Sequence, residues 1–332
     1  MLAAILAATL TASQIDSVVT NAEAAFHDYV FPDVAAKAVA MLKTNAAKYR
    51  TFTDPQKFAD AVDADLIQTT HDKHVQIYYP YDPDTMSPTQ GDAAAEHRME
   101  AFLDYEFTTV RRLPGNVGYI DFVGFSSDAQ AGQAIHSAMA FVSSTDALII
   151  NLRNNGGGDS RTASALEGYF FSGVQPMTST MVRDPATGML SETQQYTSPS
   201  EPGSLYVDKP VYLLTSNYTF SCAEQFAYDL QSLKRVTIVG EVTGGGANPG
   251  DFKYLGNHFD IFMPNGYAQN PITKKNWEGV GVQPDVSSSA NDAFTTAYRL
   301  ALGKVRGTYS DPAIRERIDQ AIKDAGRLAP QP

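Results

Sequence analysis

The chain has 332 residues and a formal net charge of -12, with 43% apolar and 19% charged residues. Its length suits a large domain plus a smaller one, and its apolar share excludes a disordered tail. The negative charge and the lack of any run of basic residues argue against nucleic-acid binding. Cys222 is the single cysteine, which excludes an intramolecular disulfide framework and a multi-cysteine zinc site. No segment reaches the roughly 18 apolar residues of a membrane span.

The first residues admit two interpretations. Residues 2–10 (LAAILAATL) are similar to the apolar core of a secretion signal, although basic residues do not precede them. Alternatively, they lead into the first helix, with Thr11 or Ser13 as its N-cap. We expect an extracytoplasmic location, periplasmic or secreted, while a cytoplasmic one stays open.

Residues 1–75 are predicted to form a helical domain. Apolar residues recur at helical spacing over residues 13–26, and Phe31-Pro32 interrupts the pattern. An alanine-rich helix is predicted over residues 34–49. Asp54-Pro55 begins a third helix, which continues to about residue 69 with its apolar side chains on one face.

Residues 76–332 are predicted to form an α/β domain. A polar loop spans residues 78–98, a polar hairpin or flap spans residues 178–206, and residues 291–328 are helical. Strand-like apolar runs alternate with helical stretches in between, which indicates an α/β core. The predicted strands cover residues 117–122, 147–152, 211–215 and 236–239, and the predicted helices cover residues 129–142, 161–171 and 221–233.

Ser221 lies where a buried strand turns into a helix, in VYLLTSNYTFSCAEQF. That position presents the hydroxyl at the edge of the sheet and places helix N–H groups beside it, where they would stabilise an oxyanion. A serine at a helix start can also be a simple N-cap, with Glu224 as its capping-box partner. This segment by itself leaves both interpretations open.

Three glycines follow another buried strand in DALIINLRNNGGGD. Glycine permits positive φ and a close backbone approach, and the N–H groups of such a loop can form an oxyanion hole or an anion nest. The pattern does not match a phosphate-binding P-loop or the dinucleotide fingerprint. A tight strand-to-helix turn is the alternative.

His71 and His74 lie in THDKHVQIYY, between the helical domain and a strand, and sites are often built at such junctions. On a continuing helix both would share a face and could bind a metal, but a clear third ligand is missing. Either histidine could also be a surface polar residue. Glu278, which begins EGVGVQPDV, would by itself be an exposed turn carboxylate.

Six segments in chain order together resemble the tail-specific (C-terminal-processing) serine proteases, the tricorn core protease and the repeat modules of interphotoreceptor retinoid-binding protein. The segments are DKHV, VGYIDFVGF, LIINLRNNGGGD, TFSCAEQFAY, VGEVTGGG and EGVGVQPDV. The resemblance covers residues from about 13 to 290 and implies a crotonase-like α/β core with an N-terminal helical bundle.

The resemblance offers two catalytic solutions. In the Ser-Lys branch a lysine follows the serine, but Gly246 stands in its place here, so that dyad is absent. The tricorn-like branch uses a histidine and a glutamate, and His74 and Glu278 match those positions. That branch has a serine before its histidine where this chain has Lys73, so the link between Glu278 and His74 is open. The segment between His74 and Val117 is too short for the family's PDZ domain.

The resemblance therefore implies a serine peptidase that forms an acyl-enzyme on Ser221, with His74 as base and Glu278 as the acid that orients it. The N–H groups of Cys222 and of Gly157 or Gly158 would hold the oxyanion. No metal or cofactor is needed, the partner is a peptide or protein substrate, and the oligomeric state stays unassigned. The alternatives are a non-catalytic module that binds a hydrophobic ligand such as a retinoid or fatty acid, and an esterase with the same triad.

Overall fold

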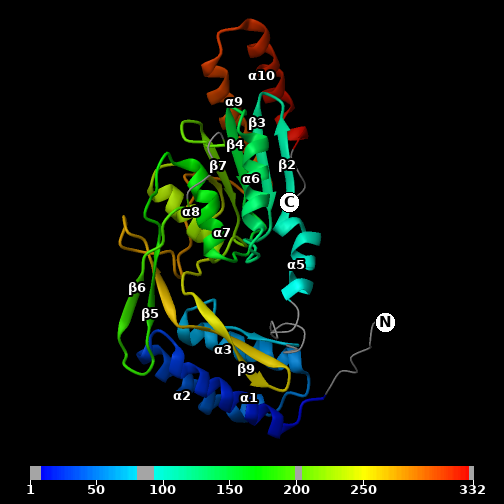
Figure 1. The fold of residues 1–332 in the computed structure, drawn as a ribbon. Coiled ribbons are helices and arrows are strands. Elements are labelled where there is room, and N and C mark those ends of the chain that lie inside the picture. The colour runs from blue at the N-terminus through cyan, green and yellow to red at the C-terminus, as the bar shows by residue number, and fades with distance from the viewer. Residues whose placement is uncertain (1–8, 81–92, 199–203, 329–332) are drawn as a thin grey trace. The chain divides into compact units, whose positions relative to one another are not determined.

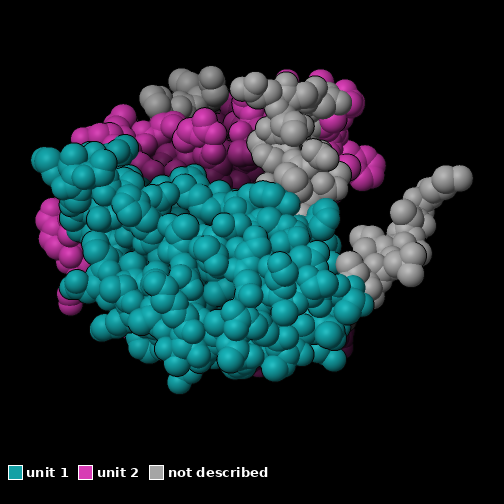
Figure 2. Space-filling view, turned by 90° about the horizontal axis from the view of Figure 1, so that it is seen from below, with its two compact units in different colours: residues 1–93, 180–193, 248–268 teal, residues 94–179, 194–247, 269–332 magenta. Residues whose placement is uncertain are grey.

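The structure, a computed structural model, describes residues 9–80, 93–198 and 204–328 (Figure 1). The chain separates into two compact units, coloured in Figure 2. Unit 1 consists of residues 1–93, 180–193 and 248–268, and unit 2 of residues 94–179, 194–247 and 269–332. The domain division after residue 75 stays a prediction. Residues 1–8, most of the segment interpreted as a signal or lead-in, lie outside the described residues.

Three helices of unit 1 confirm the helical N-terminal prediction. They are α1 (Ala12–Ala25), α2 (Pro32–Tyr49) and α3 (Pro55–Thr70), with a 3-10 turn at Phe26–Asp28. Thr11 caps α1 and Asp54 caps α3, each through a side-chain oxygen that accepts a backbone N–H of the first turn. Proline at the first position of α2 and α3 favours a helix start because its fixed φ is helical and no N–H is lost.

A three-stranded antiparallel sheet closes the apolar faces of these helices. Its order is β1 (Ile77–Tyr78), β10 (Phe259–Pro264) and β9 (Gly250–Gly256). Leu255, Phe259, Ile261 and Met263 share one buried core with the helices. The sequence analysis did not assign β9 and β10, which reach the helices from almost 200 residues away.

A second three-stranded sheet, formed mostly by residues of unit 1, confirms the predicted hairpin. Its order is β11 (Gly266–Gln269), β5 (Ser179–Arg183) and β6 (Leu190–Thr193), and β5 and β6 are antiparallel. All four residues of β6 are exposed, which is typical of an edge strand.

Unit 2 is built on a six-stranded, mostly parallel sheet. Its order is β12 (Val286–Ser287), β8 (Thr237–Gly240), β7 (Val211–Thr215), β4 (Ala147–Asn151), β3 (Val117–Phe122) and β2 (Phe107–Leu113). Only β2 runs antiparallel to its neighbour. All five residues of β4 and of β7 are buried, as expected for parallel strands covered on both faces.

Helices cover both faces of this sheet, which confirms the predicted α/β core. The helix α9 (Ala290–Thr308) packs on one face through Phe294 and Tyr298. On the other face lie α6 (Ala131–Val142), α7 (Ser160–Glu167) and α8 (Cys222–Ser232) (Figure 1). The remaining helical segments are α5 (Ala93–Phe102), α10 (Pro312–Asp324) and short 3-10 turns at Asp104–Glu106, Gly168–Phe170 and Ala325–Arg327.

One loop prediction needs correction. Residues 81–92 of the predicted loop over 78–98 lie outside the described residues, but Ala93–Phe102 form α5. The prolines before this segment favour a loop, but the segment itself, AAAEHRMEAF, is rich in strong helix formers. In the described parts of the chain, no helix is long and apolar enough to cross a membrane.

Candidate active site

Ser221 is the N-cap of α8 and has an unusual backbone. Its φ is 54° and its ψ is -122°. The N-caps that accept a backbone N–H through their side chains all have negative φ and extended ψ; they are Thr11, Asp54, Asp159, Ser289 and Asp311. A non-glycine residue in this region costs about 1–3 kcal/mol and is found mostly at functional sites. A serine that only capped the helix would not need this conformation, so the backbone favours a role beyond capping.

Glu224 is the buried acceptor that holds the turn around Ser221. Its Oε2 accepts the N–H groups of Ser221 at 2.9 Å and Gly246 at 2.8 Å. Its Oε1 accepts the Gly245 N–H at 2.7 Å and the Thr243 hydroxyl. Burial raises the pKa of Glu224, while these hydrogen bonds oppose the shift. Sequence reasoning named Glu224 as a capping partner and missed the second loop that it binds.

The glycine loop after β4 lies directly against the candidate nucleophile. A Cβ on Gly157, whose φ is +109°, would be 2.8 Å from Ser221 Cβ and 3.0 Å from Cys222 N. Asn155, fully buried, accepts the Gly157 N–H at 2.9 Å and donates to the Phe122 carbonyl at 3.2 Å. Glycine is therefore required at 157, and Asn155 is a positioning residue that the sequence analysis did not single out.

Of the three predicted oxyanion donors, the Gly157 N–H is already used in a hydrogen bond. The Gly157 N–H is bound by Asn155, as described above. Gly158 pairs with Phe125 in a parallel bridge in which Phe125 bonds Gly157 and Asp159, so the Gly158 N–H points away from Phe125. Cys222 is the first residue of α8, where a backbone N–H has no partner within the helix. This geometry favours the N–H groups of Gly158 and Cys222 as oxyanion donors.

The thiol of Cys222 is unsuited to nucleophilic attack. The residue is buried, and burial, together with the nearby carboxyl groups of Glu167, Asp159 and Asp229, raises the pKa of its thiol well above the ordinary value. Because the thiolate is the reactive form, the cysteine next to Ser221 does not compete with the hydroxyl.

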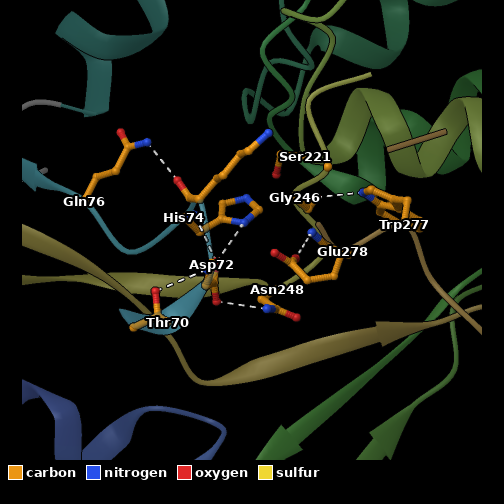
Figure 3. Close-up of polar contacts among 12 residues, drawn as sticks. Thr70, Asp72, His74, Gln76, Ser221, Gly246, Asn248, Trp277 and Glu278 are labelled. Atoms are coloured by element: carbon orange, nitrogen blue, oxygen red, sulfur yellow. Dashed lines mark hydrogen bonds and ion pairs between the residues drawn. The ribbon is translucent and has the colours of Figure 1, made fainter. Parts of the chain in front are cut away.

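Glu278 is anchored to the loop that Glu224 also binds. Its Oε2 accepts the Ala247 N–H at 2.5 Å, and the indole of the buried Trp277 donates to the Gly246 carbonyl at 2.7 Å (Figure 3). Gly246 occupies the place of the lysine in the Ser-Lys branch. Its N–H donates to Glu224 and its carbonyl accepts the Trp277 indole N–H. Glu278 is half-buried and is not the exposed turn carboxylate that the local sequence would suggest.

His74 lies in unit 1 beside a buried carboxylate. Asp72, only 2% exposed, accepts the His74 backbone N–H at 2.9 Å, and its Oδ1 lies 3.9 Å from His74 Nδ1. The Asp72 Oδ2 accepts the Tyr29 hydroxyl at 3.0 Å. It also accepts the Asn248 amide N–H at 2.9 Å (Figure 3). Burial lowers the pKa of His74 and the Asp72 charge opposes this shift. The sequence analysis missed Asp72, although it stands two residues before the histidine.

The helix-face interpretation of His71 and His74 as metal ligands is wrong. The helix α3 ends at Thr70, and His71 takes a left-handed conformation with φ 57° as its C-cap. The two histidines therefore do not share a helix face, and His71 has a structural role. Lys73 is exposed.

Unit 2 thus brings together Ser221, Cys222 and Gly157, and it ties Glu278 to the loop that Glu224 holds against Ser221. The proposed base, His74, belongs to unit 1 with Asp72. Its assignment as the base stays a prediction.

Comparison with known proteins adds a family and a fold. Residues 116–288, more than half of the chain, match the family model of Peptidase family S41. A structure from Parabacteroides merdae assigned as a peptidase has a TM-score of 0.55 and 18% identity, covering 80% of this chain and 88% of its own. A lipoprotein from Streptococcus agalactiae has a TM-score of 0.54 and 14% identity, covering 88% and 96%. At these identities the two structures show a shared fold.

Proposed function

The chain belongs to peptidase family S41, and from this premise we propose that it cleaves peptide bonds through an acyl-enzyme formed on Ser221. Membership confirms the family resemblance drawn from the six sequence segments. The single observation that carries the proposal is the positive φ of Ser221 at the start of α8, against the glycine loop. This geometry is typical of a nucleophile presented at a strand-to-helix turn.

In the proposed reaction, His74 takes the hydroxyl proton of Ser221 as the serine oxygen attacks the peptide carbonyl carbon. The N–H groups of Cys222 and Gly158 stabilise the resulting oxyanion. His74 then gives the proton to the leaving amine as the C–N bond breaks. Water, deprotonated by His74, then attacks the ester carbonyl carbon. As the C–O bond breaks and the acid leaves, His74 returns the proton to the Ser221 oxygen. Glu278 is proposed to orient His74 or to stabilise its cation.

The test is covalent labelling with a fluorophosphonate, followed by mass spectrometry to locate the label. We expect the label on Ser221, and we expect Ser221→Ala to abolish it and to lower kcat for a peptide by at least about 10³-fold. Ser289→Ala is the matched control, because Ser289 caps α9 with ordinary extended backbone and should keep full labelling.

Three outcomes would contradict the proposal. Turnover that persists in Ser221→Ala, or a label on another residue, would remove Ser221 as the nucleophile. Hydrolysis of esters without any peptide cleavage would favour the esterase. Absence of both labelling and hydrolysis would favour the ligand-binding module.

A further inference from the structure

The outer face of the β1-β10-β9 sheet in unit 1 carries aromatic side chains. Its inner face packs on the helices through Ile77, Leu255 and Ile261. Because side chains alternate along a strand, the residues between these point to the outer face. They are Tyr78 of β1, Phe252 and Tyr254 of β9, and Asp260 and Phe262 of β10.

The aromatic rings on this face form a continuous set of contacts that begins at His74. The His74 ring lies 5.6 Å from the Phe262 ring, measured between centroids. Phe262 contacts Phe252 at 5.2 Å, and Phe252 contacts Tyr78 at 5.4 Å, both edge-on. Tyr78, Phe252 and Tyr254 are 43%, 55% and 53% exposed, so this apolar surface is open to a ligand.

Asp260 lies at the centre of this face. It is the register partner of Tyr78 on one side and of Tyr254 on the other. The residue is 1% exposed, and among the described residues its Oδ1 has no hydrogen-bond partner. Burial raises the pKa of Asp260 to about 6. Lys253, the register partner of Ile261, points to the other face and pairs with Asp28 at 2.9 Å. A buried carboxylate without a partner is costly, and a cation would remove that cost.

We infer that this face, with Asp260 at its centre, binds a lysine or arginine side chain of the peptide substrate; the inference rests on the proposed peptidase function. The aliphatic stem of either side chain packs on aromatic rings, and its charged end interacts with their faces and with the carboxylate. A purely apolar side chain would leave Asp260 without a partner, and an acidic one would be repelled. One carboxylate supplies too few oxygens for a calcium or magnesium site.

The proposed role of His74 as the base implies that the recognised side chain binds near the scissile bond. The aromatic set starts at His74, the proposed base, and Phe252 is two ring contacts from it. The preferred basic residue should therefore occupy one fixed position within a few residues of the cleaved bond. The net charge of -12 adds a long-range attraction for basic peptides.

The experiment profiles cleavage of an equimolar mixture of synthetic peptides by mass spectrometry. We expect the wild type to favour lysine and arginine at one position, and matched Lys and Gln peptides to differ in kcat/KM by about tenfold to a hundredfold. Asp260→Asn should remove this preference while it keeps cleavage of the Gln peptide. Asp251→Asn is the matched control, because Asp251 is a carboxylate of the same sheet on the opposite face, bound by the Asn265 amide at 2.8 Å.

The outcomes separate this inference from the proposed function. Cleavage without a basic preference, or a preference that survives Asp260→Asn, overturns the specificity site and leaves the peptidase intact. If no peptide is cleaved and Ser221 is not labelled, the peptidase proposal fails. In that case the specificity site is tested by measuring the affinities of acetyl-Ala-Ala-Lys-Ala-Ala-amide and its Gln counterpart. Tighter binding of the Lys peptide supports the site, and equal affinities overturn it.

Discussion

Asp72 is the carboxylate that the structure places beside the proposed base. It holds the His74 backbone through a hydrogen bond, and its Oδ1 lies 3.9 Å from the imidazole Nδ1, too far for a hydrogen bond but close enough for a strong charge interaction. Tyr29 and Asn248 fix the other oxygen. This chain has Lys73 where the tricorn-like branch has a serine, and Asp72 is the local polar partner of His74 instead.

We predict that Asp72→Asn shifts the acid limb of kcat/KM to lower pH. Burial already lowers the pKa of His74, and the Asp72 charge raises it, so loss of that charge lowers it further. The imidazole then stays neutral, and active as a base, to lower pH. The measurement is the pH profile of kcat/KM between pH 4 and pH 8.

Tyr29→Phe is the matched control for Asp72→Asn. It removes one hydrogen bond to Asp72 but keeps the charge, so it should lower stability and leave the pH profile in place. An unchanged acid limb in Asp72→Asn would show that the carboxylate only supports the backbone.

Glu278→Gln should reduce the rate less than Ser221→Ala. A glutamine oxygen can still accept the Ala247 N–H, so the loop should keep its position while the charge is lost. If that charge acts on His74, the acid limb also moves to lower pH. In the serine protease subtilisin, loss of the triad's acid costs roughly a hundredfold less in kcat than loss of its serine. Steady-state kinetics across pH test this, and an unaltered rate and profile would remove Glu278 from the mechanism.

Among the secondary-structure elements, α3 and β1 are joined by a carboxylate of unusual pKa. Asp63 of α3 accepts the Ile77 N–H, the first of β1, at 2.6 Å. Burial raises the pKa of Asp63 to about 7, and the nearby Asp60 adds to the rise while the hydrogen bond opposes it. The folded state therefore holds this proton to higher pH than the unfolded state does.

We predict that Asp63→Asn becomes more stable than the wild type as the pH rises from about 4 to about 7. In that range the unfolded carboxyl ionises and the folded one does not, so the wild type loses stability; the neutral amide does not titrate. The gain above pH 7 should be about 2–4 kcal/mol, and Asn can still accept the Ile77 N–H. Chemical denaturation at several pH values measures it.

Asp60→Asn serves as the control for the Asp63 prediction. Asp60 is exposed one turn away on α3, so its loss removes a charge but not the buried titration. A stability difference between Asp63→Asn and the wild type that does not vary with pH would contradict the raised pKa.

For the molecule as a whole, the proposed catalytic residues are shared between two compact units. His74 belongs to unit 1, and Ser221 and Glu278 belong to unit 2. Proton transfer requires a base within hydrogen-bond reach of the hydroxyl, so catalysis demands one particular arrangement of the units.

We predict that a crystal structure of the fluorophosphonate adduct places an imidazole nitrogen of His74 within about 4 Å of Ser221 Oγ. The unmodified enzyme in the same crystal form is the control. The presence of His71 there instead, or of no histidine, would contradict the assignment of the base.

The sequence by itself determined the order and type of most elements. Periodicity located α1, α2 and α3 because each must bury one face, and continuous apolar runs located β3, β4 and β7 because both faces of those strands are covered. The six segments were sufficient to indicate the family. Ser221 could be placed at a helix start, but capping and catalysis could not be separated until its positive φ was known.

Only the tertiary structure decided which polar groups meet. Asn248 reaches Asp72 from 176 residues away, and the β9 and β10 strands that carry Phe252 and Asp260 join helices from the other end of the chain. No local pattern marks these residues, because a buried carboxylate acquires its role from partners that folding brings to it. Propensity and periodicity act over a few residues, whereas burial and charge pairing depend on the whole fold.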